Sequence, residues 1–277
     1  MKEAHPNKSV VIGAAPNGAR KRKQDCPNLP IHPDELIESA FECMGAGATY
    51  FHFHLRGTHG QHLLNAAMCG SVLQRLRNTL GDRMLFQVTT ESASLYSPNE
   101  QMAFVDALEP VPISIAIREF LPVTDSVLAV FLHRTVSRGF WIQYIIYTVE
   151  ELTHLIRLQT DGIVPQVRPA VLFVLGSYLD RRSGRPNDLL PFVQHIIAGW
   201  PWSVCAFGSQ EHRCTVTAAL LGGHMRVGFE NNVLLADGSP AAKNSVLIQQ
   251  AMDELCHLNL QVADIAATGV VIGKPAE

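Results

Sequence analysis

The sequence predicts a single (β/α)8 barrel, the TIM barrel fold, on three observations. Short β-branched segments alternate with amphipathic segments along all 277 residues, at about 35 residues for each pair, the size of one βα unit. Hydrophobic residues make up 47% of the chain, enough for a large core. No Pro/Ser linker divides residues 1–277, so we expect one domain with an N-terminal extension (1–8) and a C-terminal tail (259–277).

The first half of the chain contains four strand–helix pairs. The first strand, residues 9–14, ends at the turn that contains Pro16 and Gly18, and Pro33 opens the first helix, which Gly45 ends. The next strands are expected at 49–55, 84–89 and 113–117, and their helices at 66–80, 99–108 and 126–137.

The second half repeats the alternation. Its strands are expected at 141–147, 170–175, 202–207 and 225–229, and its helices at 149–159, 187–198, 211–221 and 245–258. A doubly wound sheet is the alternative fold, but no G-x-G-x-x-G motif follows the first strand. The strands of a closed barrel would direct their carboxyl ends to one mouth, where the active site of this fold lies.

Composition excludes several classes of function. Lys and Arg total 22 against 25 Asp and Glu, so there is no basic excess for a nucleic-acid partner. No uncharged apolar run approaches the ~20 residues that span a bilayer, which predicts no membrane partner. The six cysteines form no C-x-x-C pair and are expected to be reduced. We therefore expect a soluble, cytoplasmic protein.

The second strand carries the clearest chemical signal. His52 and His54 alternate with apolar residues, so both imidazoles point to one side of the strand, near its carboxyl end. Two histidines about 6–7 Å apart can share one divalent metal. The alternative is a pair of hydrogen-bonded core histidines.

The eighth strand supplies a carboxylate. Arg226 and Glu230 lie four residues apart where this strand ends, and strands two and eight are both close to strand one in a closed barrel. Glu230 can therefore approach the histidines. Two imidazoles and one carboxylate leave an open position on zinc. The alternative is a structural ion pair between Arg226 and Glu230 at the rim.

Two further segments at the same mouth can meet a ligand. Gly208 and Ser209 lie between the seventh strand and its helix, where backbone N–H groups can bind an anion or form an ordinary cap. Arg20 is the basic residue nearest the first strand in a charged loop, and it can face the pocket or solvent. The histidines outside the motifs are expected at the surface, with His59 and His62 in a loop at the mouth.

Four motifs in order resemble the β-keto acid cleavage enzymes, the family of 3-keto-5-aminohexanoate cleavage enzyme. They are A-P-N-G-A at 15–19, G-A-G-A at 45–48, H-F-H-L-R at 52–56 and G-G-H-M-R-V-G-F-E-N-N at 222–232, within a match over about 10–258. The resemblance implies a zinc site of His52, His54 and Glu230. It also implies acyl transfer between a β-keto acid and acetyl-CoA, giving acetoacetate and a new acyl-CoA, and a homo-oligomer, expected to be a tetramer.

The resemblance also implies roles for other residues. Arg226 would hold a carboxylate or oxyanion, and Gly208 with Ser209 would receive CoA phosphates. Many relatives carry Asp, their expected base, where this chain has Asn231, which cannot accept a proton. Glu119, after the fourth strand, is then the expected base, unless it only pairs with Arg20 or Arg118. The residues expected to bind substrate are Arg20, Thr89, Ser92 and Asn231.

Two other functions compete with acyl transfer. A zinc hydrolase resembling the amidohydrolases would place histidine ligands on strands five and six, and neither segment contains a histidine. A non-catalytic barrel that binds a metal or a metabolite is the other alternative, because Asn231 replaces the expected base.

Overall fold

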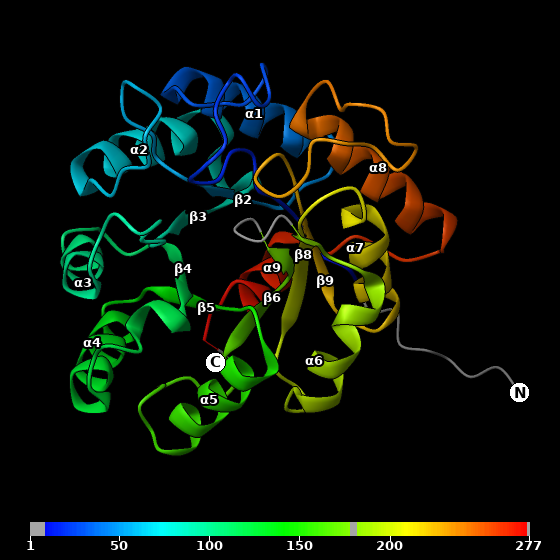
Figure 1. Cartoon of the computed structure of the whole chain (residues 1–277). Helices are drawn as coiled ribbons and strands as arrows, with labels where there is room; N and C mark the ends of the chain where they lie inside the picture. Colours follow the sequence, from blue (N-terminus) through cyan, green and yellow to red (C-terminus); the bar gives the residue numbers. More distant parts are fainter. Residues whose placement is uncertain (1–8, 178–181, 276–277) are drawn as a thin grey trace, which may run out of the picture.

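The strands close into a barrel, as the sequence predicts. In the computed structural model, which describes residues 9–177 and 182–275, the sheet order is β5-β4-β3-β2-β1-β9-β8-β6, and β5 also pairs with β6. These neighbours are all parallel, and the helices surround them (Figure 1). The fold is a single (β/α)8 barrel within the described residues. The predicted extension at 1–8 lies outside them.

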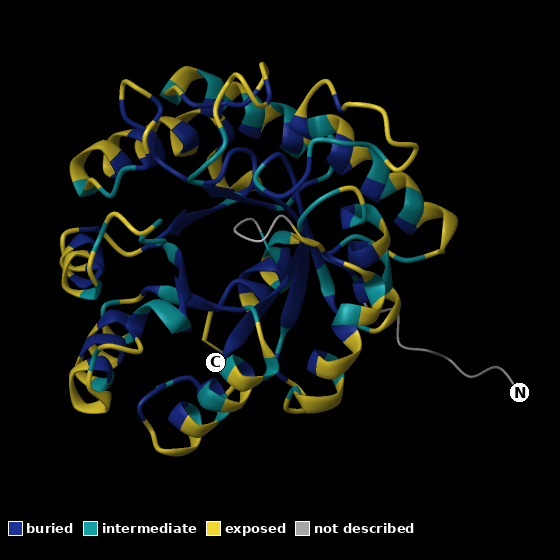
Figure 2. Ribbon diagram, viewed as in Figure 1, coloured by how far each residue is buried: buried dark blue, intermediate teal, exposed yellow. Residues whose placement is uncertain are grey.

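The strands lie close to their predicted positions. They are β1 (Ile12–Ala14), β2 (Tyr50–Phe53), β3 (Leu85–Thr89), β4 (Pro112–Ala116), β5 (Trp141–Ile146), β6 (Ala170–Ser177), β8 (Trp202–Ala206) and β9 (His224–Val227). A short strand, β7 (Arg182–Ser183), pairs antiparallel with the end of β6. The β-branched runs form these strands because both faces are buried, one toward the lumen and one toward the helices (Figure 2).

The helices cover the outside of the barrel. They are α1 (Pro33–Gly45), α2 (Ala66–Leu80), α3 (Pro98–Asp106), α4 (Asp125–Ser137), α5 (Val149–Thr160), α6 (Leu190–His195), α7 (Glu211–Leu220) and α8 (Asn244–His257). The 3-10 turns are η1 (Gly81–Arg83), η2 (Ile117–Phe120) and η3 (Pro186–Leu189), so the helix expected at 187–198 is a 3-10 turn followed by a short α-helix. No helix among the described residues is long and apolar enough to cross a membrane.

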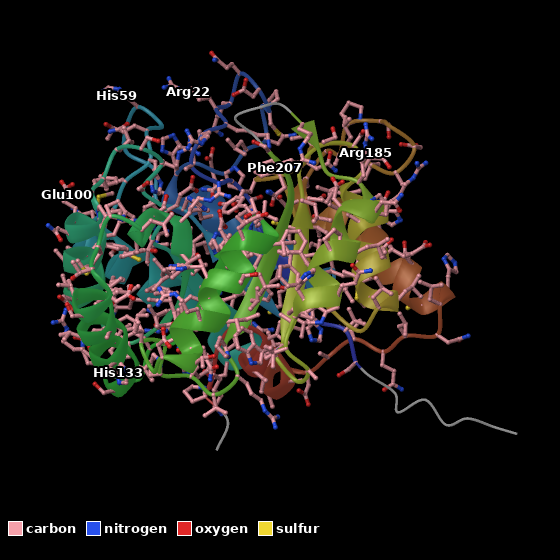
Figure 3. All side chains as sticks on the ribbon, turned by 60° about the horizontal axis from the view of Figure 1, so that its bottom comes forward. Arg22, His59, Glu100, His133, Arg185 and Phe207 are labelled. Carbon is pink, nitrogen blue, oxygen red and sulfur yellow. The ribbon has the colours of Figure 1, made fainter. Side chains whose placement is uncertain are left out.

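The segment predicted as a C-terminal tail contains a further helix, α9 (Ile265–Val271). It lies at the amino ends of the strands, where Thr268 Oγ1 donates to Thr49 Oγ1 and the Val271 carbonyl accepts from Gln143. Val271 and Ile272 are buried against Val11 and Tyr50. The helix therefore closes the lower end of the lumen, and a ligand must enter from the opposite mouth. Figure 3 shows Arg22, His59 and Arg185 near that mouth, with His133 toward the other end.

Candidate metal centre

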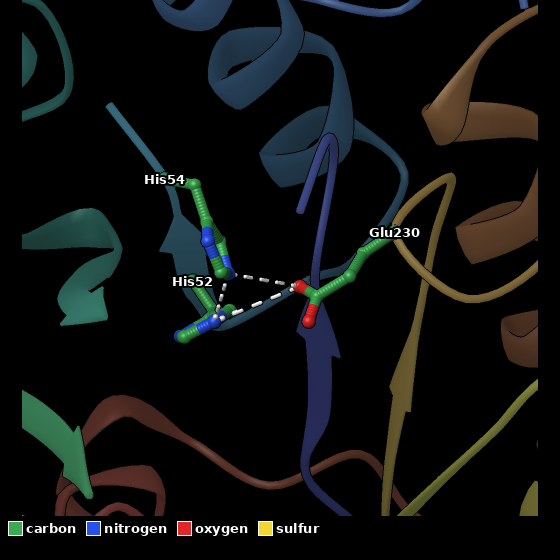
Figure 4. Close-up of side chains that lie close together, drawn as sticks. All are labelled: His52, His54 and Glu230. Atoms are coloured by element: carbon green, nitrogen blue, oxygen red, sulfur yellow. Dashed lines mark hydrogen bonds and ion pairs between the residues drawn. The ribbon is translucent and has the colours of Figure 1, made fainter. Parts of the chain in front are cut away.

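Three side chains meet at the carboxyl ends of β2 and β9. His52 Nε2 and His54 Nε2 are 3.1 Å apart, and each lies 3.6 Å from Glu230 Oε2 (Figure 4). Both histidines are 1% exposed, and these three residues form the one cluster of metal-ligating side chains among the described residues. The imidazoles share one side of β2 because side chains alternate along a strand.

The spacing of these atoms fits a four-coordinate metal ion. Ligand atoms bound at ~2.0–2.1 Å to a tetrahedral zinc lie about 3.3–3.4 Å apart, close to the separations of the three atoms here. Glu230 Oε2 is buried and accepts no hydrogen bond from any described residue. Such an orphaned carboxylate oxygen facing two imidazole nitrogens is a donor set that a divalent cation satisfies.

The outer nitrogens of both histidines face polar side chains. His52 Nδ1 lies 2.9 Å from Gln87 Oε1, which can only accept, so Nδ1 carries the proton and Nε2 keeps its lone pair. Gln87 Nε2 in turn donates to Gln143 Oε1, and Gln143 Nε2 donates to Ser203 Oγ. This buried series of hydrogen bonds fixes the orientation of the His52 ring. His54 Nδ1 lies 3.8 Å from Glu91 Oε2, beyond hydrogen-bond distance, and has no hydrogen-bond partner among the described residues.

The electrostatics keep the cluster in its ligating form. Burial, followed by the charge of Arg226, holds the pKa of His52 well below its usual value, so the imidazole is neutral. Burial alone would raise the pKa of Glu230, but Arg226, whose Nη2 lies 3.2 Å from Glu230 Oε1, outweighs it and holds that pKa well below the usual range. Glu230 thus presents one oxygen to Arg226 and the other to the histidines.

The loop after β1 brings Glu230 to the histidines. Asn17 binds the backbone of His54 through both amide atoms, and Lys21 Nζ donates to the Glu230 carbonyl at 2.8 Å. Gly18 has φ +61°, and a Cβ there would lie 2.6 Å from Glu230 Cγ, so only glycine allows this approach. Arg56 donates to the carbonyls of Gly18 and Lys21. Residues of the A-P-N-G-A and H-F-H-L-R motifs therefore position the cluster of His52, His54 and Glu230.

A cavity lies above the cluster and contains most of the predicted site. Its wall includes His52, His54, Thr89, Arg226, Glu230 and Asn231. Nε and Nη1 of Arg226 and both amide atoms of Asn231 are buried without a hydrogen-bond partner among the described residues. Because buried polar groups are nearly always paired, these atoms are available to a polar ligand beside the cluster of His52, His54 and Glu230.

Glu119 and Ser92 lie away from this cavity. Glu119 accepts hydrogen bonds from Ser92 N and Oγ and from Gln101 Nε2, at 2.6–3.1 Å, and neither Glu119 nor Ser92 lines the cavity. The geometry therefore does not favour Glu119 as the base. It engages neither Arg20 nor Arg118 in an ion pair within 4 Å, as far as the described residues show. Arg118 pairs with Glu151 instead.

The anion site expected at Gly208 and Ser209 is only partly available. The Gly208 N–H donates to the Asn231 carbonyl at 3.1 Å, so this group holds the backbone of Asn231 and cannot reach a phosphate. Ser209 stays a prediction. His62, expected at the surface, is 3% exposed, and its Nε2 lies 2.7 Å from the Glu91 carbonyl.

Glu91 is the residue that the sequence interpretation missed. It lines the cavity, with its carboxylate 3.8 Å from both His54 Nδ1 and Arg20 Nη2. Arg20 itself lies at the outer edge of this mouth. Burial raises the pKa of Glu91 above its ordinary value. The available signal was its place just beyond the third strand, because Glu91 follows the end of β3 by two residues as Glu230 follows the end of β9 by three.

A buried carboxylate beside the site predicts a pH-dependent stability. Burial raises the pKa of Glu211 to about 8, against hydrogen bonds from Asn232 and Gly228. Between about pH 5 and 8 the folded state then binds a proton that the unfolded chain has released. The free energy of unfolding should therefore fall with rising pH, by up to ~1.4 kcal/mol per unit.

The Glu211→Gln variant should flatten this slope, as measured by urea unfolding from pH 5 to 8, because the amide cannot ionise. Glu109→Gln, at an exposed position, is the matched control and should retain the wild-type slope. A slope that survives in Glu211→Gln would assign the effect to another group.

Comparison with known proteins identifies similar sequences and folds. Residues 9–271 match the sequence model of a family described as beta-keto acid cleavage enzyme. The 3-keto-5-aminohexanoate cleavage enzyme of Fusobacterium nucleatum is 25% identical, over 92% of this chain and 94% of that protein. The 3-oxoadipate:acetyl-CoA acetyltransferase of Cupriavidus necator is 23% identical, over 96% and 95%. The complex of ObcA with oxaloacetate shares the fold, with a TM-score of 0.69 and 14% identity over 90% of this chain and 68% of that one.

Proposed function

Because the chain belongs to the β-keto acid cleavage enzyme family, we propose that it transfers an acyl group between a β-keto acid and acetyl-CoA. The products are acetoacetate and a new acyl-CoA, and the reaction takes place at a zinc ion held by His52, His54 and Glu230. The observation that carries the proposal is the cavity itself. Its wall contains three atoms that can bind a metal ion and two Arg226 nitrogens without a hydrogen-bond partner among the described residues. This combination suits an anionic, oxygen-rich substrate.

The reaction exchanges two carbon–carbon bonds. A base removes a proton from C2 of the keto acid, and C2 then attacks the acetyl carbonyl carbon, releasing the CoA thiolate. The thiolate adds to C3, the original keto carbon, and the bond between C2 and C3 breaks. This yields the new acyl-CoA and the carbanion of acetoacetate, and the proton returns to C2. A bound zinc ion supplies Lewis-acid polarisation of the keto oxygen.

The side chains of the cavity support each of these requirements. Arg226 offers Nε and Nη1 to a carboxylate or a developing oxyanion, in a buried site where such contacts are strong. Asn231 offers an amide N–H beside it. We assign the proton transfer to Glu91, because its carboxylate lies in the cavity wall whereas that of Glu119 does not.

Acetyl-CoA must approach from the mouth, because α9 closes the other end of the lumen. The loop after β1 carries Arg20, Lys21, Arg22 and Lys23 at this end, and Ser209 follows β8, which is separated from β1 by β9 alone in the sheet order. Lys21 is engaged with the Glu230 carbonyl, whereas Arg22 is exposed. We propose that this loop and Ser209 receive the CoA phosphates.

An isotope experiment tests the reaction. Zinc-loaded protein is incubated with a β-keto acid and acetyl-CoA labelled with 13C in the acetyl group, and the products are analysed by mass spectrometry. The label is expected in acetoacetate, while the new acyl-CoA carries the unlabelled acyl chain of the keto acid. A hydrolase would instead release a free carboxylic acid and form no new acyl-CoA. That result, or no reaction with any β-keto acid, would refute the proposed function.

A further inference from the structure

We propose that the β-keto acid used by this protein carries an uncharged, apolar chain on its keto carbon. This inference rests on the proposed function and names its substrate class. It follows from the way in which the strands divide the cavity wall into a charged half and an apolar half.

The charged half comes from neighbouring strands on one side of the barrel. Arg226 and Glu230 belong to β9 and its loop, His52 and His54 to β2 and its end, and Glu91 follows β3. In the sheet order, β9, β1, β2 and β3 are consecutive. The metal ligands and the unpartnered guanidinium nitrogens are all in this half, so the carboxylate and the reacting carbonyl of the substrate must lie here.

The apolar half comes from the remaining strands, β4, β5, β6 and β8, which are also consecutive around the barrel. They contribute Ala116, Ile145 and Val174, together with Phe207 just after β8 and the ring of Tyr147. Leu172 and Cys205 pack behind these side chains in one hydrophobic cluster. Among the residues that the structure describes, no charged side chain of this half lines the cavity.

Among the residues that the structure describes, the charges nearest to the apolar wall of the cavity are already engaged. Arg118 stacks 3.5 Å over the Tyr147 ring and pairs with Glu151, 2.7 Å away. Arg20 lies across the mouth, 3.8 Å from Glu91. An ammonium or a second carboxylate on the acyl chain would therefore be desolvated against apolar side chains, with no countercharge from the described part of this wall. Such burial costs far more than the loss of one apolar contact.

The orientation of the substrate follows from the two halves. With its carboxylate and keto group at Arg226 and the metal ligands, the chain beyond the keto carbon must extend toward Ile145, Val174 and Phe207. An alkyl chain there exchanges water for apolar contacts. The substrates named for the two curated relatives carry an amino group or a second carboxylate, and no described residue of this half that lines the cavity carries a charge to pair with either group.

A panel of six-carbon acids tests this inference at constant chain length. It consists of 3-oxohexanoate, 3-oxoadipate and 5-amino-3-oxohexanoate, which differ in the charge carried by the chain beyond the keto carbon. We expect kcat/KM for 3-oxohexanoate to exceed that for either charged acid by about 100-fold or more. Equal values, or a preference for a charged acid, would overturn the inference while leaving the proposed acyl transfer intact.

A variant at the apolar wall gives an independent test. Val174→Lys places an ammonium opposite the metal ligands and should shift the preference toward 3-oxoadipate by at least about tenfold. Val174→Met, of similar length and uncharged, is the matched control and should retain the preference for 3-oxohexanoate. A shift of the same size in both variants would refute the assignment of this wall to the acyl chain.

Binding without turnover separates this inference from the proposed function. The stable analogues 3-hydroxyhexanoate and 3-hydroxyadipate, which cannot undergo the reaction, are titrated calorimetrically into the zinc-loaded protein. Tighter binding of the hexanoate by about tenfold or more supports the apolar wall even if no acyl transfer is detected. Tighter binding of the adipate contradicts it, whatever the reaction proves to be.

Discussion

The His52→Ala/His54→Ala double variant is expected to lose its zinc and its acyl transfer together. Removing two of three protein ligands leaves Glu230 alone, which cannot hold the ion at micromolar concentrations. Turnover should fall by ~10³-fold or more, because the polarisation of the keto group is lost. Metal content measured by mass spectrometry should drop from one ion per chain to almost none.

The barrel should remain folded in this variant. The two imidazoles contribute to a buried polar layer, and their loss leaves Gln87 Oε1 without its donor, at a cost of about 1–3 kcal/mol. Circular dichroism should show an unchanged helical spectrum. His59→Ala, which removes an exposed histidine near the same mouth, is the matched control and should keep both metal and activity. Full metal occupancy in the double variant would disprove the ligand assignment.

Glu91→Gln and Glu119→Gln should separate the two candidate bases. Glu91→Gln removes the carboxylate that lines the cavity, so kcat should fall by ~10²-fold or more, with a smaller change in KM. Glu119→Gln should change kcat only a few-fold. It should lower the melting temperature, because an amide cannot accept all the hydrogen bonds that Ser92 and Gln101 donate.

The metal content of both variants must be measured alongside the kinetics, because Glu91 lies near His54. A Glu91→Gln protein that binds zinc normally but turns over slowly supports the base role. The reverse pattern, with Glu119→Gln inactive and Glu91→Gln active, would restore Glu119 as the base.

Asn231 is placed to contact a substrate and not to act as the base. Asn231 is buried with both amide atoms facing the cavity, so it can contact the substrate but cannot accept a proton. Its backbone is held by the Gly208 N–H and its chain neighbour is the metal ligand Glu230. The geometry of the position is thus that of a substrate contact.

The amino-acid sequence was enough to predict the barrel and the cluster of His52, His54 and Glu230. Strand periodicity set the direction of His52 and His54, and the closed order of parallel strands placed Glu230 beside them. These features could be predicted because they depend only on the period of the backbone and on which end of each strand a residue follows. Both are properties of a local segment.

The contacts of the side chains at the mouth became visible only in the folded protein. Ser92 and Gln101 donate hydrogen bonds to Glu119, and the Gly208 N–H donates to the Asn231 carbonyl. Glu91 lines the cavity. The structure also showed that α9 closes the lumen and that the cavity wall is divided by charge. Hydrogen-bond partners in loops come from segments far apart in the chain, and their geometry is set by the packing of all the strands around one axis. No local pattern in the sequence contains that information.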